Sequence, residues 1–167
     1  LATQQWHLRN TGQTAYADSA GVAGMDINVE PVYSILGIAG SGVIAAVVDT
    51  GLEIAHEDLA ANVVLNGSWN FINSTTNPTN TVDTTGDHGT SVGGLIAMAR
   101  NTAGGIGVAS AARLKGFNFL RSQSVANNVA SLGGSASNPV SNDVFVFNQS
   151  YGTGPPAAFL SNPTVAA

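Results

Sequence analysis

Asp49 and His88 are the two side chains of this chain whose types and settings favour joint proton transfer. Asp49 ends an apolar run and is followed by a Thr-Gly turn, and His88 precedes an apolar segment rich in glycine and alanine. A carboxylate can fix the tautomer of an imidazole and stabilise the imidazolium, while the imidazole takes the proton of a serine hydroxyl. The pair therefore indicates two of the three groups of a Ser–His–Asp hydrolase.

Each residue alone also has a plainer interpretation. Asp49 could be an ordinary turn or capping residue at a strand end, because Asp and Gly are common in turns. His88 could be a loop histidine at a helix start. The combination favours catalysis, since a buried strand delivers the carboxylate and a small-residue helix follows the imidazole, 39 positions further on.

The elements that would position this pair alternate along the chain. The uninterrupted apolar run 43–48 predicts a strand buried on both faces of a parallel sheet. Further strands are predicted at 63–65, 68–72, 113–120 and 143–150, and helices at 26–36, 91–100 and 124–132. This order predicts an α/β fold, a parallel sheet with helices on both faces. Asp49 would then stand at the carboxyl end of its strand, where sites of such sheets form.

Composition excludes several classes of protein. Hydrophobic residues make up 44% of the 167 residues and charged residues only 9%, so disorder is not expected. The net charge is −5 with a single lysine, Lys115, which argues against nucleic acid as a partner. The chain has no cysteine and no apolar run of the roughly 18 residues that a membrane span needs.

The two motifs resemble the aspartate and histidine signatures of the subtilisin-like serine proteases (subtilases, peptidase family S8). The chain order Asp before His before Ser is known for that family. Segments 4–8 and 51–59 are similar to the kexin-type branch in particular. Further similar segments, in the same order, are Gly107-Val108-Ala109 and Asn148-Gln149-Ser150-Tyr151-Gly152.

The resemblance implies that residues 1–167 are the N-terminal part of a single subtilisin-like catalytic domain, incomplete in this chain. Asp49 would orient the imidazole and His88 would be the general base. The nucleophilic serine would lie outside the chain, because Ser91 belongs to the histidine signature and no matching serine motif occurs. The peptide substrate would add as a strand beside Ser150, Tyr151 and Gly152.

The same resemblance implies structural calcium, with Asp58 and Asn101 as ligands, since calcium takes oxygen donors. The expected partners are a peptide or protein substrate, the remaining C-terminal part of the domain, and a propeptide or chaperone. The expected location is secreted, or periplasmic and cell envelope. A preference for paired basic residues is not favoured, because Thr50 and the segment 153–156 stand where the kexin-type branch has acidic side chains.

Two alternatives remain open at this point. The chain could be a non-catalytic pseudoprotease or a peptide-binding module of the same fold, with Asp49 and His88 as relics. A nucleotide-binding α/β domain is a weaker alternative, because the segment 50–53, Thr-Gly-Leu-Glu, has neither the glycines nor the lysine of a phosphate loop.

Overall fold

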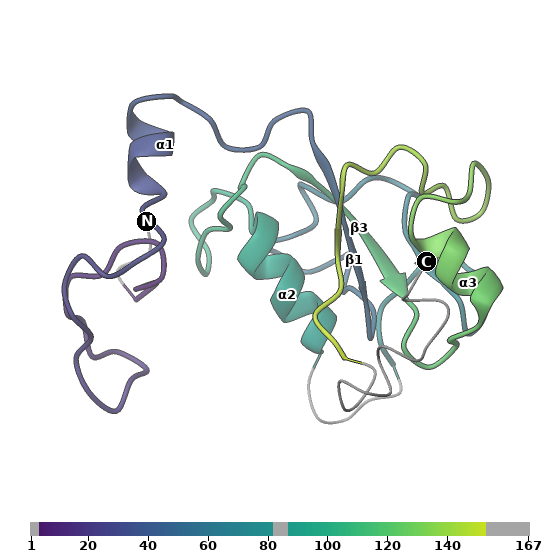
Figure 1. Cartoon of the computed structure of the whole chain (residues 1–167), viewed down its shortest axis with the longest axis horizontal. Coiled ribbons are helices and arrows are strands. Elements are labelled where there is room, and N and C mark those ends of the chain that lie inside the picture. Colours follow the sequence, from purple (N-terminus) through teal and green to yellow (C-terminus); the bar gives the residue numbers. More distant parts are fainter. Residues whose placement is uncertain (1–3, 82–86, 153–167) are drawn as a thin grey trace.

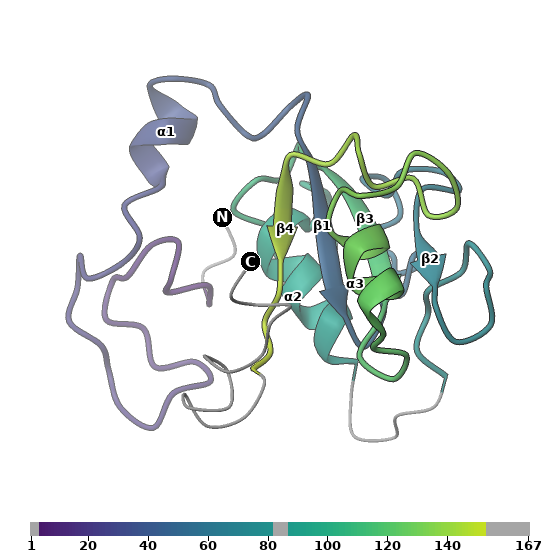
Figure 2. The same ribbon diagram turned by 45° about the vertical axis from the view of Figure 1, so that its right-hand side comes forward.

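The fold is built on a four-stranded parallel sheet, seen in a computed structural model that describes residues 4–81 and 87–152. The strands are arranged in the order β2-β3-β1-β4. Figure 1 shows β1 and β3 side by side, and Figure 2 labels all four strands. Their bounds are β1 Ile44–Asp49, β2 Trp69–Asn70, β3 Arg113–Asn118 and β4 Val146–Asn148. The helices are α1 Glu30–Ser34, α2 His88–Ala97 and α3 Val125–Ser131. The expected α/β class with a parallel sheet is confirmed.

Strand β1 lies at the centre of the sheet, between β3 and β4. Residues 45–48 are between 0% and 4% exposed, so both faces of this strand are covered, as the apolar run predicts. The register pairs Asp49 with Asn118, which places two polar side chains together at the carboxyl ends of β1 and β3.

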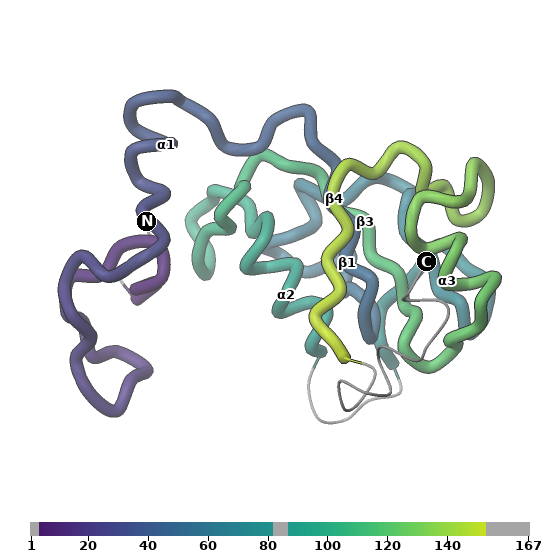
Figure 3. The backbone as a smooth tube through the Cα atoms, viewed as in Figure 1, coloured from purple at the N-terminus to yellow at the C-terminus, as the bar shows by residue number. Residues whose placement is uncertain are grey.

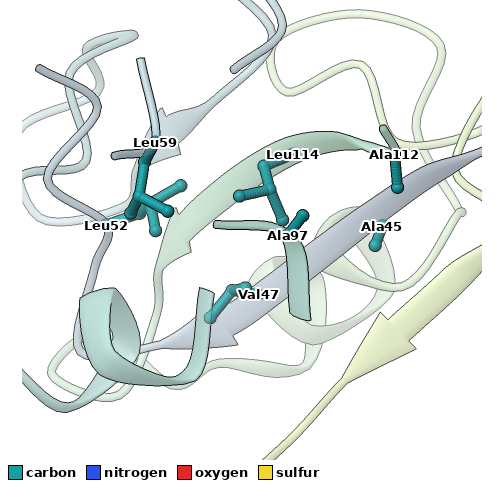
Figure 4. Close-up of a cluster of buried hydrophobic side chains, with 7 residues drawn as sticks. All are labelled: Ala45, Val47, Leu52, Leu59, Ala97, Ala112 and Leu114. Carbon is teal, nitrogen blue, oxygen red and sulfur yellow. The ribbon is translucent and has the colours of Figure 1, made fainter. Parts of the chain in front are cut away.

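The two faces of the sheet carry separate apolar clusters. On one face α2 covers a cluster drawn in Figure 4, which consists of Ala45, Val47, Leu52, Leu59, Ala97, Ala112 and Leu114. The other face carries Ala46, Val48, Phe117 and Phe119. Figure 2 shows α3 in front of the sheet and α2 behind it, so the two helices lie on opposite faces. Alternation along β1 sends odd-numbered side chains to one cluster and even-numbered ones to the other.

Several elements differ in extent from the sequence expectation. Helix α2 begins at His88 rather than at residue 91, because the Asp87 side chain caps it by accepting from the Thr90 N–H. Helix α1 and strand β4 are shorter than predicted. The expected strand at 63–65 is only an isolated bridge between Val63 and Leu114.

The segment 4–36 lies at one side of the molecule, beside the turn that follows α2 (Figure 3). The Gln5 side-chain amide donates to the Ile106 carbonyl and accepts from the Ile106 N–H. The Tyr33 hydroxyl donates to the Val108 carbonyl. A small apolar cluster of Leu8, Val29 and Ile106 closes this contact. Among the residues described, no helix has the length and apolar character needed to cross a membrane.

Candidate active site

Asp49 stands at the carboxyl end of the central strand, as predicted. Its side chain is fully buried, at 0% exposure. The carboxylate Oδ1 accepts from the Thr50 N–H at 2.6 Å, and the Asp49 carbonyl accepts from the Phe119 N–H at 2.9 Å. A buried carboxylate is costly unless it has hydrogen-bond partners. The Thr50 N–H and the imidazole of His88 are such partners of the carboxylate.

His88 lies at the first position of α2, and its ring meets the Asp49 carboxylate directly. Nδ1 is 2.9 Å from Oδ1 and 3.0 Å from Oδ2 of Asp49. The histidine side chain is 55% exposed, whereas the carboxylate is buried. Because Nδ1 faces the carboxylate, Nε2 is the nitrogen that remains to exchange a proton with another group. The structure therefore brings together the two residues that the sequence singled out.

Two threonine hydroxyls connect the Asp49 and His88 motifs by hydrogen bonds. The sequence did not predict this role for either threonine. The Gly89 N–H donates to the Thr50 Oγ1 at 3.1 Å, and the Glu53 N–H donates to the Thr90 Oγ1 at 2.8 Å. Each hydroxyl follows one of the two candidate catalytic residues by one or two positions. A hydroxyl beside each motif was the available signal, but its partner becomes visible only in three dimensions.

Ser91 takes no part in the Asp49–His88 contact. Its hydroxyl donates to the Asp87 carbonyl at 3.2 Å, one helical turn back. This is an ordinary local bond of a serine inside a helix. Ser91 therefore serves α2, in agreement with its exclusion as a nucleophile.

Tyr151 approaches the site from the segment that follows β4. Its ring lies 6.2 Å from that of Phe119, and its hydroxyl donates to Gln149 Oε1 at 2.9 Å. Burial, with a smaller contribution from the nearby Asp49 charge, raises the pKa of Tyr151 to about 12. Ser150 and Gly152 are exposed, and the Ser150 hydroxyl accepts from the Asn148 amide. Thus the segment 150–152 follows edge strand β4, and its Tyr151 comes near Asp49.

Asn118 is a further residue of the site that was not identified from the sequence, and it lies at the carboxyl end of β3. It is 2% exposed, and its Oδ1 has no hydrogen-bond partner among the residues described. Its strand register sets it beside Asp49. A polar residue closing an apolar strand was the only sequence signal, and an amide in that place is common in turns.

Asp58 and Asn101, the expected calcium ligands, are in contact. The buried Asp58 carboxylate accepts from the Asn101 amide at 3.0 Å, while Asn101 Oδ1 accepts from the Ala103 N–H. A Cβ on Gly104 would overlap Asp58 Oδ2, so glycine lets the turn approach that oxygen closely. Within 4–81 and 87–152, no three His, Cys, Asp or Glu side chains are placed so that they could hold one metal ion together. One carboxylate and one amide fit a hard cation only if backbone carbonyls or water complete the ligand set.

The geometry agrees with what the chain resembles in sequence. The family model "Subtilase family" matches residues 40–166. An extracellular serine protease of Aeromonas sobria is 44% identical over 152 residues, which cover 91% of this chain and 24% of that protein. Neuroendocrine convertase 2 of Bos taurus is 37% identical over 123 residues, covering 72% of this chain and 18% of the convertase.

Solved structures give the same result. The serine protease of Aeromonas sobria in complex with the chaperone ORF2 superposes with a TM-score of 0.83 at 40% identity, covering 98% of this chain and 27% of the protease chain. The chain belongs to the subtilase family, and the expected kinship with the kexin-type branch is confirmed. It spans about a quarter or less of the length of the curated relatives it matches.

Proposed function

We propose that this chain is the N-terminal part of a single catalytic domain of a serine endopeptidase, and that Asp49 and His88 are two members of its triad. The observation that carries the proposal is the contact between the buried Asp49 carboxylate and Nδ1 of the half-exposed His88 ring. The family match and the serine protease relatives support the same activity. The third member, a serine, lies outside residues 1–167 in this proposal.

The reaction is acyl transfer in two steps. The serine hydroxyl attacks the peptide carbonyl, and its proton passes to Nε2 of His88, while Asp49 stabilises the imidazolium through Nδ1. The imidazolium then returns that proton to the departing amine as the C–N bond breaks. A water molecule, deprotonated in turn by His88, cleaves the resulting ester and regenerates the serine.

The substrate is proposed to bind as an extended strand along Ser150, Tyr151 and Gly152. Edge strand β4 precedes this segment, and main-chain hydrogen bonds to an added strand bind peptides largely irrespective of sequence. A tyrosine is neutral near pH 7 at its ordinary pKa of 10.0, and burial raises the pKa of Tyr151 further. A neutral phenol beside Asp49 adds no charge to the candidate site. Substrate contacts of Thr153 and the residues after it lie outside the described residues.

Labelling with a fluorophosphonate tests the activity. The full-length protein that carries this chain should be labelled, and the His88→Ala variant should lose labelling because no base activates the serine. Ser91→Ala is the matched control and should retain labelling, since the Ser91 hydroxyl donates to its own helix. Labelling that survives His88→Ala, or that disappears in Ser91→Ala, would contradict the assignment.

The second candidate function is a non-catalytic pseudoprotease or peptide-binding module of the same fold. The place of β4 as the outermost strand of the described sheet, and the segment 150–152 that follows it, favour it equally. It predicts a correctly folded, full-length protein without fluorophosphonate labelling that still binds extended peptides. Isothermal titration with a peptide library measures that binding, and the absence of labelling separates this outcome from an enzyme.

Structural calcium is part of the same proposal, with Asp58 and Asn101 as ligands after the Asn101 amide turns its oxygen toward the ion. The metal would bridge the segment before residue 60 to the turn at 101–105 and so stabilise it. Calcium added after EDTA treatment should raise the melting temperature of the protein, and should not do so in Asp58→Asn. An equal shift in both proteins would show that calcium binds elsewhere.

Secretion and a folding partner are proposed from relatives. An Aeromonas sobria relative is an extracellular serine protease, and a serine protease of that organism is solved in complex with a chaperone. We expect this protein to leave the cytoplasm, to the medium or to the cell envelope, and to require a chaperone or propeptide for folding. Co-expression with the chaperone ORF2 of the Aeromonas sobria complex, compared with expression alone, measures that requirement as the yield of soluble protein.

A further inference from the structure

We propose that Thr50 is a positioning residue that caps the helix carrying His88 from the other motif, and so fixes the His88 ring against Asp49. The proposal rests on the proposed function of this pair. The first N–H groups of an α-helix have no partner within the helix. In α2 the Thr90 N–H is satisfied by the helix's own cap, Asp87, and the Gly89 N–H is satisfied by Thr50 Oγ1 at 3.1 Å.

The two contacts come from adjacent residues on each side. The Asp49 carboxylate contacts the His88 ring, and the Thr50 hydroxyl accepts from the Gly89 N–H. Two consecutive residues at the end of β1 therefore bind two consecutive residues at the start of α2. Two bonds between dipeptides fix the direction of the helix as well as its distance, whereas the carboxylate contact alone would let the ring swing. Thr50 N–H also donates to Asp49 Oδ1, which ties both members of the first dipeptide to one geometry.

A second hydrogen bond joins the same two motifs, and here the donor belongs to the Asp49 motif and the acceptor to the His88 motif. The Thr90 hydroxyl accepts from the Glu53 N–H at 2.8 Å, so each motif offers a hydroxyl to the backbone of the other. Between these bonds, Gly89 packs on the Gly51 carbonyl with no room for a side chain. The hydroxyl oxygen of Thr50 thereby accepts from α2, which gives this residue a part in alignment.

The test compares Thr50→Val with Thr50→Ser in the full-length protein. Valine keeps the shape but removes the acceptor, and serine restores it. We expect kcat for a peptide substrate to fall about 10- to 100-fold in Thr50→Val with KM nearly unchanged, because misalignment affects the transition state. Thr50→Ser should remain within about threefold of the parent protein. Thr75→Val, the matched control, removes a hydroxyl that bonds only within its own exposed turn and should leave kcat unchanged.

Hydrogen exchange at the Gly89 amide measures the bond without reference to activity. Protection should fall about tenfold in Thr50→Val, as expected for a lost helix cap, and should return in Thr50→Ser. Unchanged protection would overturn the cap, and lost protection with unchanged kcat would overturn the positioning role. If the parent protein shows no His88-dependent labelling, the proposed function fails instead, and exchange still decides whether the cap exists.

Discussion

Gly89 lies directly against the Gly51 carbonyl, and a Cβ on Gly89 would overlap that oxygen and approach the Asp49 Cβ to 3.1 Å. Since the neighbour is backbone rather than a flexible side chain, it cannot give way easily. The turn after the candidate carboxylate and the first turn of α2 are therefore in contact at a position where only glycine fits.

Gly89→Ala should consequently separate Asp49 from His88. We expect a loss of about 1–3 kcal/mol in the free energy of unfolding, as overpacking in a tight interior causes, together with a strong loss of fluorophosphonate labelling. Urea denaturation and labelling rates measure the two effects. Gly24→Ala is a useful comparison because a Cβ there meets nothing within 4 Å, although its φ of +83° also adds strain. Equal labelling by Gly89→Ala and the parent protein would refute this packing argument.

Asp49→Asn tests the electrostatic part of the site. The amide is of the same size but carries no charge, and it can present an N–H to His88 and so favour the wrong tautomer. By analogy with other triads, we expect activity to fall about 10⁴-fold. The fall should appear in kcat rather than KM when peptide hydrolysis is measured. A change of less than tenfold would mean that the carboxylate only supports the fold.

The buried Lys115 predicts a stability effect away from the site. This side chain is 2% exposed, and its ammonium lies 2.7 Å from Asp143 Oδ1 and 2.8 Å from the Val140 carbonyl. Asp143→Ala would leave the ammonium buried with only part of its partners. Removing one partner of a fully buried pair costs about 3–5 kcal/mol. Because Asp143 is 43% exposed and screened by water, we expect about 2 kcal/mol, measured by urea denaturation.

Lys115→Met is the matched comparison for that pair. It removes the charge along with its need for a partner, so it should cost less than Asp143→Ala. Equal or greater loss in Lys115→Met would show that packing of the aliphatic stem, rather than the unpaired charge, governs stability here.

Tyr151 predicts how stability depends on alkaline pH. Its pKa rises from 10.0 to about 12 on folding, mainly through burial. The folded protein therefore keeps this phenolic proton over a range in which the unfolded chain loses it. The stabilisation is fully present below pH 10 and is lost as the pH rises to about 12. The stability difference between the parent protein and Tyr151→Phe should accordingly fall between pH 10 and 12, measured by denaturation at each pH. A flat difference would show that Tyr151 ionises as freely as in the unfolded chain.

Much of the fold could be predicted because local patterns specified it. The apolar run at 43–48 predicted a strand buried on both faces, and residues 45–48 are buried as the central strand β1. The sequence predicted that this helix begins at residue 91, three residues after its observed start at His88. Asp87 caps the helix, whereas the small-residue pattern on which the prediction was based begins later. The predicted strand at 63–65 is only one bridge long, because the chain turns at Val64–Gly67 directly after Val63 pairs with Leu114.

The sequence by itself determined the chemical types at the site: a carboxylate after a buried strand, an imidazole at a helix start, and the family to which both motifs belong. Only the tertiary structure decided that they touch, that Thr50 rather than a residue of α2 satisfies the Gly89 N–H, and that Asn118 lies beside Asp49. The reason is physical. Residue types and local periodicity act over a few neighbours, whereas these contacts join segments 39 or more positions apart and depend on how the strands are ordered in the sheet.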